Sequence, residues 1–356
     1  MNAISDDAPL ALRTPMPMPI PRSRQFLLLL RREFWEHKGG FLWVPLVAGG
    51  VSLLLTLLAT IFGEAVLRGS SDKIIDIGDR SMRLNDAIYN LDSLNLSAVE
   101  LRKLGDAIEA ILYLSTAWSF IAMTVVVFLY CLNSLYDERK DRSVLFWKSL
   151  PISDGQTVLS KAVSAALVIP TLAALAGIAT MLGFLLLMSA LVLFHGGNPF
   201  TFVWATGNPF SVIAHILAAI PIYALWALPT VGWLMLCSAW ARGKPGLWAI
   251  MLPLFAGIAV TFVSAIFGSL DVLHIDSGWF WNNIVRRALT SIVPGSWIDT
   301  VRSLDFADSN RVMASVSSLR SLYATLLTPQ LWLGAIAGAL MIYGAVQLRR
   351  RRELAD

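Results

Sequence analysis

Charged residues and cysteines are both scarce in this chain. Only 15% of its 356 residues are Asp, Glu, Lys or Arg, whereas 56% are hydrophobic. Because a soluble domain carries roughly 25% charged residues, this composition excludes an ordinary soluble protein and predicts an integral membrane protein. The two cysteines, Cys131 and Cys237, lie inside apolar runs. Two such residues build neither a disulfide framework nor a four-ligand zinc site, so we predict no metal centre.

Motifs that would give the chain catalytic chemistry of its own are also missing. The four histidines are His37, His195, His215 and His274. Their spacing places no set of metal ligands on one helical face. The Gly243-Lys244 pair is followed by Pro245 and lacks a phosphate-binding loop around it. We therefore predict no enzymatic activity and no cofactor, and any energy from ATP must come from another chain.

Long apolar runs dominate what is present. Six of them can cross about 30 Å of hydrocarbon as helices. They are Phe41–Phe62, Leu112–Leu135, Ala162–Phe194, Ser211–Ala241, Leu247–Phe267 and Leu331–Leu348, and none contains Asp, Glu, Lys or Arg. The pattern predicts an all-α integral membrane protein with six transmembrane helices. An ion-coupled secondary transporter normally buries ionisable groups at mid-membrane, so the uncharged runs argue against that class.

The basic residues between the runs predict the orientation. They gather in one set of connections: Arg22, Arg24, Arg31, Arg32, Lys38, Arg139, Lys140, Arg142, Lys148, Lys161, Arg242, Lys244 and 349–352. The other set includes residues 64–111, with nine acids against six bases, and 268–330, with five of each. Because basic connections stay in the cytoplasm, both termini are predicted to be cytoplasmic and these two loops to lie outside. Short juxtamembrane clusters of this kind indicate membrane topology and no nucleic-acid partner.

The chain ends carry no apolar core. Residues 1–23 contain several prolines and acids and predict a disordered cytoplasmic tail, and 350–356 form a short cytoplasmic C-terminal tail. Within residues 24–40, Phe26, Leu30 and Phe34 recur at helical spacing among charged residues. This pattern predicts an interfacial helix in the lipid headgroups. A simple extension of the first span is the alternative.

Both outer loops contain helical signals. Residues 97–100, Ser-Ala-Val-Glu, have the form of a capping box, which predicts a helix that runs into the second span. In the last outer loop, 282–293 and 312–327 are too short or too polar to span, and tryptophans surround them. We predict outer-leaflet or re-entrant helices there, with Arg286 and Arg287 at headgroup level. They act either as interfacial anchors or as a gate over an exit path.

The inner connection 136–161 combines two unlike surfaces. A charged stretch, 137–142, is followed by apolar Val144–Leu150 and then by Pro151. An exposed apolar face bordered by charge suits either a groove on another protein or the lipid headgroups. The residues by themselves leave these two interpretations open.

This connection resembles the coupling-helix region of ABC-2 type permeases. Residues 138–153 read ERKDRSVLFWKSLPIS, and Lys161 follows at the start of the third span. In that family a Glu-Arg pair, a short apolar segment and Pro-[Val/Ile]-Ser recur between the second and third spans. The Arg-Arg-Glu-Phe run at 31–34 and the six spans also match, so the resemblance covers nearly the whole chain. Residues 140–142, Lys-Asp-Arg, depart from the acidic residue and glycine that many relatives carry.

The resemblance implies the permease subunit of a bacterial ABC exporter in the cytoplasmic (inner) membrane, embedded in the lipid bilayer. It implies a dimer, with itself or with a paralogous permease, and a separate cytoplasmic ABC ATPase subunit that binds ATP and Mg. The implied ATPase-coupling residues are Glu138, Arg139, Asp141, Arg142, Trp147 and Pro151. The implied secondary ATPase contact is Arg31, Arg32 and Glu33.

The resemblance also implies a passage between the second and fifth spans. Its candidate lining residues are Trp118, Phe120, Phe128, Met251, Phe255 and Phe262. An uncharged passage favours an amphipathic, lipid-like or peptide substrate. The alternative functions are a secondary transporter, and a non-transporting membrane scaffold or sensor that recruits a partner through the same inner connection.

Overall fold

Helices that can cross a membrane make up most of the protein. The computed structural model describes residues 21–69, 74–77, 80–83, 98–141, 152–269, 276–297 and 319–352. Within these ranges six helical stretches are long and apolar enough to span a bilayer. They are Gly39–Val66, Arg102–Lys140, Asp154–Phe194, Phe200–Trp240, Pro245–Phe267 and Pro329–Arg351. The predicted six-span membrane protein is confirmed at this level.

The N-terminal part contains a helix, a bend and a longer helix. α1 spans Arg22–Glu36, and α2 spans Val44–Gly69. After a bend at His37, the π-helical turn η1, Gly39–Trp43, leads directly into α2. The bend separates α1 from the first span, although the chain stays helical through the glycines. Residues 1–20 of the predicted tail lie outside the described residues, and α1 begins two residues before the predicted helix.

The connection 64–111, predicted to lie outside, contains a short hairpin that we did not predict. β1, Ile74–Ile77, pairs antiparallel with β2, Arg80–Arg83. α4 then runs without interruption from Ala98 to Asn133. Its start, directly after Ser97, confirms the predicted helix that runs into the second span. α5, Tyr136–Lys140, follows after a two-residue turn.

Prolines lie at the starts of three of the middle helices. α7 spans Asp154–Val163 and joins α8, Ile169–Phe194, through the π-helical turn η3, Ser164–Val168. Pro170 directly follows η3 inside this continuous helical stretch, and because proline has no N–H to donate, it interrupts the regular α-helical hydrogen bonds there. The π-helical turn η4, Phe200–Ala205, precedes α9, Pro209–Trp240. The fifth span is α10, Pro245–Ser269.

Short helices fill the described part of the last outer loop. α11, Ser277–Phe280, η5, Trp281–Val285, and α12, Arg286–Thr290, form one helical stretch that packs on α9 and α10. α14, Leu319–Ala324, and the 3₁₀ turn η7, Thr325–Leu327, precede α15, Pro329–Arg352. Part of both predicted outer stretches is therefore helical. Their depth in the outer leaflet stays a prediction.

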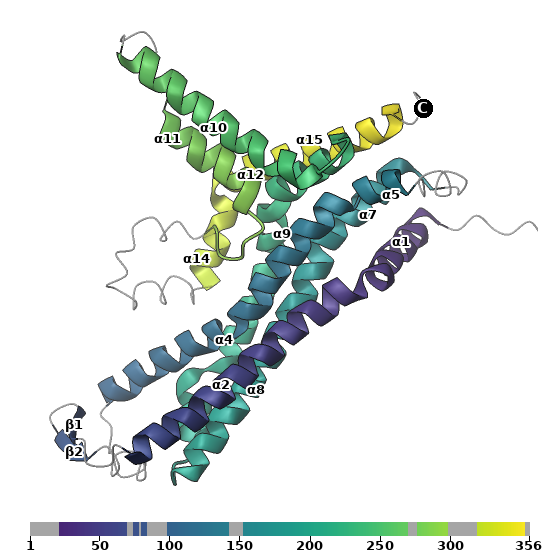
Figure 1. The fold of residues 1–356 in the computed structure, drawn as a ribbon. Helices are drawn as coiled ribbons and strands as arrows, with labels where there is room; N and C mark the ends of the chain where they lie inside the picture. The colour runs from purple at the N-terminus through teal and green to yellow at the C-terminus, as the bar shows by residue number, and fades with distance from the viewer. Residues whose placement is uncertain are drawn as a thin grey trace, which may run out of the picture.

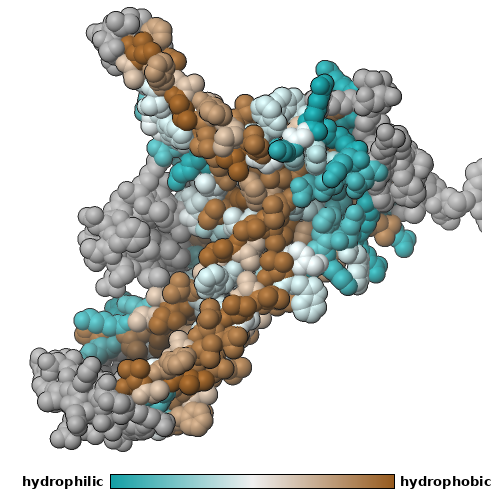
Figure 2. All heavy atoms as spheres, in the orientation of Figure 1, coloured by the Kyte–Doolittle hydropathy of each residue, from teal (hydrophilic) through white to brown (hydrophobic). Residues whose placement is uncertain are grey.

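The helices pack in two groups, which contact each other where α4 lies against α9. α2, α4 and α8 lie along one another, and α15 lies along α9 (Figure 1). α15 approaches α9 closely because glycines face each other: a Cβ on Gly232 would collide with the carbonyl oxygen of Gly338. Figure 2 shows hydrophobic residues along α2, α4 and α8, and hydrophilic residues where α5, α7 and the end of α15 meet. That hydrophilic end positions the first candidate site.

A buried ion-pair cluster and an aromatic cavity as candidate functional sites

Charged side chains from four helices converge at the hydrophilic end. Lys161 of α7 lies at the centre: its Nζ is 2.9 Å from Oε1 of Glu33 in α1 and 3.1 Å from Oε1 of Glu138 in α5. Tyr130 of α4 donates a 2.8 Å hydrogen bond to the second carboxylate oxygen of Glu33. One cation thus bridges the carboxylates of residues 33 and 138, which lie 105 positions apart in the sequence.

The last helix joins the same group. Arg349 of α15 donates a 2.8 Å hydrogen bond to Oε2 of Glu138, and its Nε lies 3.3 Å from Oδ1 of Asp154 at the start of α7. We name these residues the ion-pair cluster: Glu33, Tyr130, Glu138, Asp154, Lys161 and Arg349. Positive and negative groups alternate along it, so every charged member has at least one neighbour of opposite sign.

The centre of the cluster is removed from solvent. The exposed fractions of the Glu33 and Lys161 side chains are 1% and 3%. Charges at such depth are tolerated only when they are paired and hydrogen-bonded. Burial by itself raises the pKa of the Glu33 carboxyl, but attraction to Lys161 and the hydrogen bonds from Lys161 and Tyr130 outweigh it. The pKa of Glu33 therefore lies below its ordinary value.

Local sequence explains how α7 presents two members of the cluster. Ser153 and Gln156 form a capping box: the Ser153 hydroxyl accepts from the Gln156 N–H, and the Gln156 side chain accepts from the Ser153 N–H. This cap begins the helix at Asp154. Lys161 lies seven residues later, two turns along the same face. On this face Asp154 contacts Arg349 of α15, and Lys161 contacts Glu138 of α5.

The turn between α4 and α5 is fixed on the end of α9. The Ser238 hydroxyl accepts from the N–H groups of Leu135 and Tyr136 at 3.1 and 3.0 Å. Arg139 donates to the carbonyl oxygen of Ala241 at 2.9 Å, beyond the last turn of α9. A guanidinium at this place satisfies carbonyls that the helix leaves free and complements its dipole. These contacts therefore attach both the turn and α5 to the end of α9.

The predicted coupling residues differ in their surroundings. Glu138 belongs to the ion-pair cluster, Arg139 contacts the end of α9, and Asp141 is exposed. Arg142, Trp147 and Pro151 lie outside the described residues.

The predicted secondary contact on α1 is split between two environments. Arg31 is exposed, and Arg32 forms a 3.0 Å ion pair with Glu36 on the half-exposed side of the helix. Glu33 instead is buried, so a partner protein on the surface of α1 would not contact its side chain.

Four members of the cluster were not proposed as site residues from the sequence. Lys161 entered only as part of the family resemblance, and Arg349 only as a topology signal. The Ser-x-x-Gln capping box before α7 was the available signal for Asp154 and Lys161. For Tyr130, one tyrosine in an apolar run, the sequence carries no distinguishing signal.

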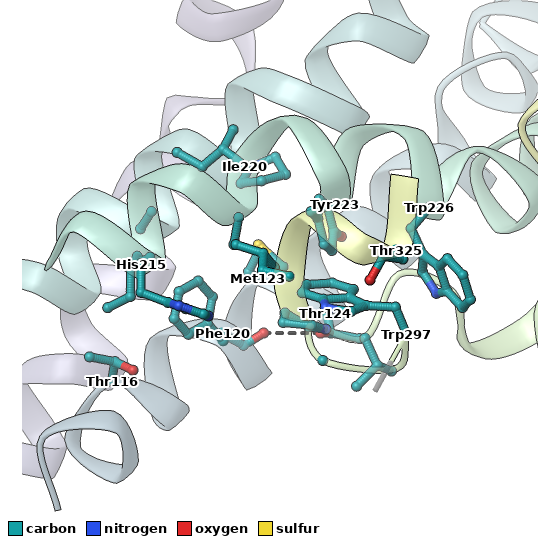
Figure 3. A pocket seen from close by; sticks show the side chains of 18 of the residues that line it. Thr116, Phe120, Met123, Thr124, His215, Ile220, Tyr223, Trp226, Trp297 and Thr325 are labelled. Carbon is teal, nitrogen blue, oxygen red and sulfur yellow. Dashed lines mark hydrogen bonds between the residues drawn. The ribbon is translucent and has the colours of Figure 1, made fainter. Parts of the chain in front are cut away.

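A second candidate site is a cavity of about 520 Å³ deeper in the bundle. It lies between α4, α8 and α9, and the segment 293–297 together with α14 and η7 covers it (Figure 3). Its largely apolar lining includes the aromatic side chains of Tyr113, Phe120, Tyr223, Trp226 and Trp297. The covering segment is held on α9 by two hydrogen bonds, from Tyr223 to the Ile292 carbonyl and from Trp226 to the Ser296 hydroxyl, both 2.9 Å.

Two polar groups in this cavity have no hydrogen-bond partner among the described residues. They are the Tyr113 hydroxyl and Nδ1 of His215, whose rings meet edge to face with centroids 6.0 Å apart. His215 is only 8% exposed, and Figure 3 shows its ring directed toward Phe120 and Met123. The cavity therefore combines aromatic walls with uncharged polar groups, which suits an amphipathic molecule.

One of the six predicted passage residues lines this cavity. Phe120 does so, whereas Phe128 packs against the buried core of α4 and α9. Trp118, Phe255 and Phe262 are more than half exposed, at 52%, 64% and 67%. Met251 is half-buried on α10. Inside a bilayer such exposed side chains meet lipid or another subunit.

Neither site contains a recognisable metal centre: within the described ranges, no three His, Cys, Asp or Glu side chains gather closely enough to hold an ion. No family model matches the chain, and neither a curated protein nor a solved structure is similar to it. The architecture is that of a helical multi-pass membrane protein, and its described residues include a buried ion-pair cluster and an aromatic cavity.

Proposed function

We propose that this chain is the transmembrane permease subunit of an ATP-binding cassette exporter in the bacterial inner membrane. A separate cytoplasmic ATPase, seated on the inner connection 136–161, binds and hydrolyses ATP. The permease acts as a dimer, with both termini in the cytoplasm. The family resemblance of residues 138–153 and the basic inner connections support this assignment.

The observation that carries the proposal is how the inner connection is anchored. Glu138 lies on its first helix, and Asp154 and Lys161 lie on its last, and all three belong to the ion-pair cluster. Through Glu33 and Arg349 the same cluster holds α1 and α15. A partner that moves this connection therefore moves the inner ends of several helices together, as a rigid-body mechanism requires.

The aromatic cavity is the proposed place for substrate. Its volume of about 520 Å³ falls in the range of small-molecule sites, roughly 300–1,000 Å³. No charged side chain lines it, and its polar groups are hydroxyl, imidazole and amide. This lining favours an amphipathic, lipid-like or peptide substrate over a small ion.

Affinity purification from the native membrane in mild detergent, followed by mass spectrometry, tests the proposal. We expect a soluble chain with a phosphate-binding loop to co-purify and to bring ATPase activity. Recovery of this chain alone, under conditions in which it stays folded, would overturn the permease assignment. A secondary transporter or a membrane scaffold would then be the better assignment.

A matched pair of variants makes that test specific to the inner connection. Lys140→Glu with Asp141→Lys exchanges two exposed charges next to α5 without touching the cluster. Lys103→Glu with Asp106→Lys makes the same exchange on exposed residues near the opposite end of α4. We expect the first variant to lose the ATPase and the second to retain it. Equal retention by both would show that the ATPase docks elsewhere.

A further inference from the structure

Arg287 of α12 is a buried cation, and no carboxylate of the described residues pairs with it. It is 8% exposed, and its guanidinium lies 4.0 Å from the centroid of the Trp226 ring. Nη1 donates to the carbonyl oxygen of Gln330, whereas Nε and Nη2 have no hydrogen-bond partner among the described residues. The described part of the chain places no Asp or Glu within ion-pair distance of it.

The contrast with the ion-pair cluster is direct. Lys161 and Arg349 are buried to a similar degree, yet each contacts two carboxylates. A buried charge without such compensation is unfavourable. Burial, and in second place the neighbouring Arg286, lower the pKa of Arg287. A guanidinium nevertheless stays protonated in proteins, so Arg287 keeps a positive charge that only an added anion would neutralise.

This cation borders a second cavity, of about 630 Å³. The cavity lies between α9, α10, α12 and α15, and away from Arg287 its walls are largely apolar, with Trp233, Leu252, Pro253 and Met341. The lining therefore offers one charged group among largely apolar residues. A free inorganic anion would satisfy only the charged group, whereas an acidic head with a hydrocarbon chain would satisfy both this group and the apolar lining.

Two further contacts place Arg287 at the boundary of both cavities. Trp226, on which the guanidinium stacks, lines the first cavity, and Gln330 lines both. On its other side the guanidinium packs against Gly334 of α15, where a Cβ would collide with Nη2. The glycine thus leaves space for the arginine beside the second cavity.

We propose that the cavity beside Arg287 binds an anionic amphiphile, with its acidic head on the guanidinium and its apolar chain along Trp233, Leu252 and Met341. Binding requires the Arg287 side chain to turn Nε and Nη2 toward the cavity that it borders. The inference rests on the proposed function in one respect: the amphiphile is assigned as cargo of the exporter, held in a second cavity that shares Gln330 with the aromatic cavity. The binding site itself requires no ATPase.

Dodecyl phosphate is the probe, and the purified chain in dodecyl maltoside is the target. The detergent carries the same alkyl chain with a neutral head, so retained radiolabelled probe reports the contribution of the charge. We expect one dodecyl phosphate per chain, displaced neither by inorganic phosphate nor by dodecyltrimethylammonium. Equal displacement by the cationic amphiphile, or full displacement by inorganic phosphate, would overturn the proposal.

Variants locate the site. Arg287→Gln removes charge-assisted hydrogen bonds and is expected to weaken binding by about ten- to a hundredfold. Arg286→Gln, on the neighbouring residue outside the cavity lining, should bind like the wild type. Ala337→Phe fills the cavity without changing a charge and should abolish binding. If Arg287→Gln fails to fold, Ala337→Phe and the comparison of head groups still decide the matter, and unchanged binding in Ala337→Phe would contradict the site.

A last measurement separates cargo from a resident lipid. Binding is measured without ATP or partner, so failure to find an ATPase leaves this result intact, and loss of binding leaves co-purification intact. In the assembled transporter, dodecyl phosphate as cargo is expected to stimulate ATP hydrolysis, and Arg287→Gln to remove that stimulation. Binding without any effect on hydrolysis would overturn the assignment as cargo.

Discussion

Arg349 donates a 2.8 Å hydrogen bond to Glu138 and joins the end of the last helix to the beginning of the inner connection. The two residues are 211 positions apart in the sequence. Glu138 also contacts Lys161, which in turn contacts Glu33 near the N-terminus. The first and last described helices, α1 and α15, are therefore joined through one buried cluster. Displacement of one member of the cluster would shift the helices at both ends of the described chain.

The Glu138–Arg349 contact predicts coupled effects of mutation. Glu138→Gln and Arg349→Gln each leave a buried partner with less compensation and are expected to lower the free energy of unfolding by about 3 kcal/mol. The double variant should lose less than the sum, with an interaction term of about 1 to 3 kcal/mol. Unfolding of the purified protein in a denaturing detergent series measures all four forms. Strict additivity would contradict a direct contact between the two side chains.

The same variants test the coupling role. With the partner ATPase present, Glu138→Gln should preserve insertion but reduce substrate-stimulated ATP hydrolysis, because α5 loses its ion pairs with Arg349 of α15 and Lys161 of α7. Glu36→Gln, which changes an exposed carboxylate of α1, serves as the control. Normal transport and assembly by Glu138→Gln would show that Glu138 has no role in coupling.

The lowered pKa of Glu33 predicts a pH dependence of stability. A carboxyl whose pKa is lower in the folded protein stabilises the fold above its ordinary pKa, and this contribution is lost as the pH falls through the folded value. The difference in unfolding free energy between wild type and Glu33→Gln should therefore be largest near neutral pH. It should shrink below pH 4.5, the ordinary pKa of this group.

Thermal denaturation between pH 7 and pH 3 measures that difference. Lys161→Gln removes the cation that lowers the pKa of Glu33 and should flatten the dependence. A difference between wild type and Glu33→Gln that grows toward low pH would reverse the sign and contradict the assigned cause.

The spans could be predicted because hydrophobicity over some twenty residues is a local property. Ala162–Phe194 was expected as one run, and the structure has a helical stretch that ends at the same residue. The ion-pair cluster could not be predicted in this way. Its charged members lie outside the runs, where charge also signals topology, and only the packing of α1, α5, α7 and α15 brings them together.

The hairpin and Arg287 illustrate two other limits. The Gly78-Asp79 pair between the two strands is a known turn signal of hairpins, although we did not predict a hairpin there. The headgroup level of Arg286 and Arg287 stays a prediction, but we did not expect α9 and α15 to enclose Arg287. Two adjacent arginines on one helix point in different directions, and the sequence holds no information on which of them a neighbouring helix covers.

The predicted orientation can be tested because the native cysteines are buried. Cys131 and Cys237 are 0% and 2% exposed, so a membrane-impermeant maleimide should not label the wild type. In intact cells we expect label on Asn198→Cys but none on Lys140→Cys or Lys244→Cys, all three being exposed positions. Permeabilised cells should label all three. The opposite pattern would reverse the orientation, and label on all three in intact cells would contradict the arrangement of spans.

The approach of α15 to α9 predicts a large effect from one added methyl group. A Cβ on Gly338 would collide with the backbone of Leu228 in α9. Gly338→Ala must therefore push the two helices apart, and overpacking of this kind costs about 1 to 3 kcal/mol. The lost packing should appear as a lower midpoint in thermal or detergent-induced unfolding.

Gly50→Ala is the matched control for this close approach. Gly50 also lies within a spanning helix, but a Cβ there has no neighbour within 4 Å. Both substitutions bring the same gain in helix propensity, about 1 kcal/mol, so their difference isolates the interhelical contact. We expect Gly50→Ala to be neutral or slightly stabilising. If Gly338→Ala were also neutral or slightly stabilising, α9 and α15 would have to lie farther apart than the facing glycines indicate. The end of α15 that carries Arg349 would then be held against the bundle by other contacts.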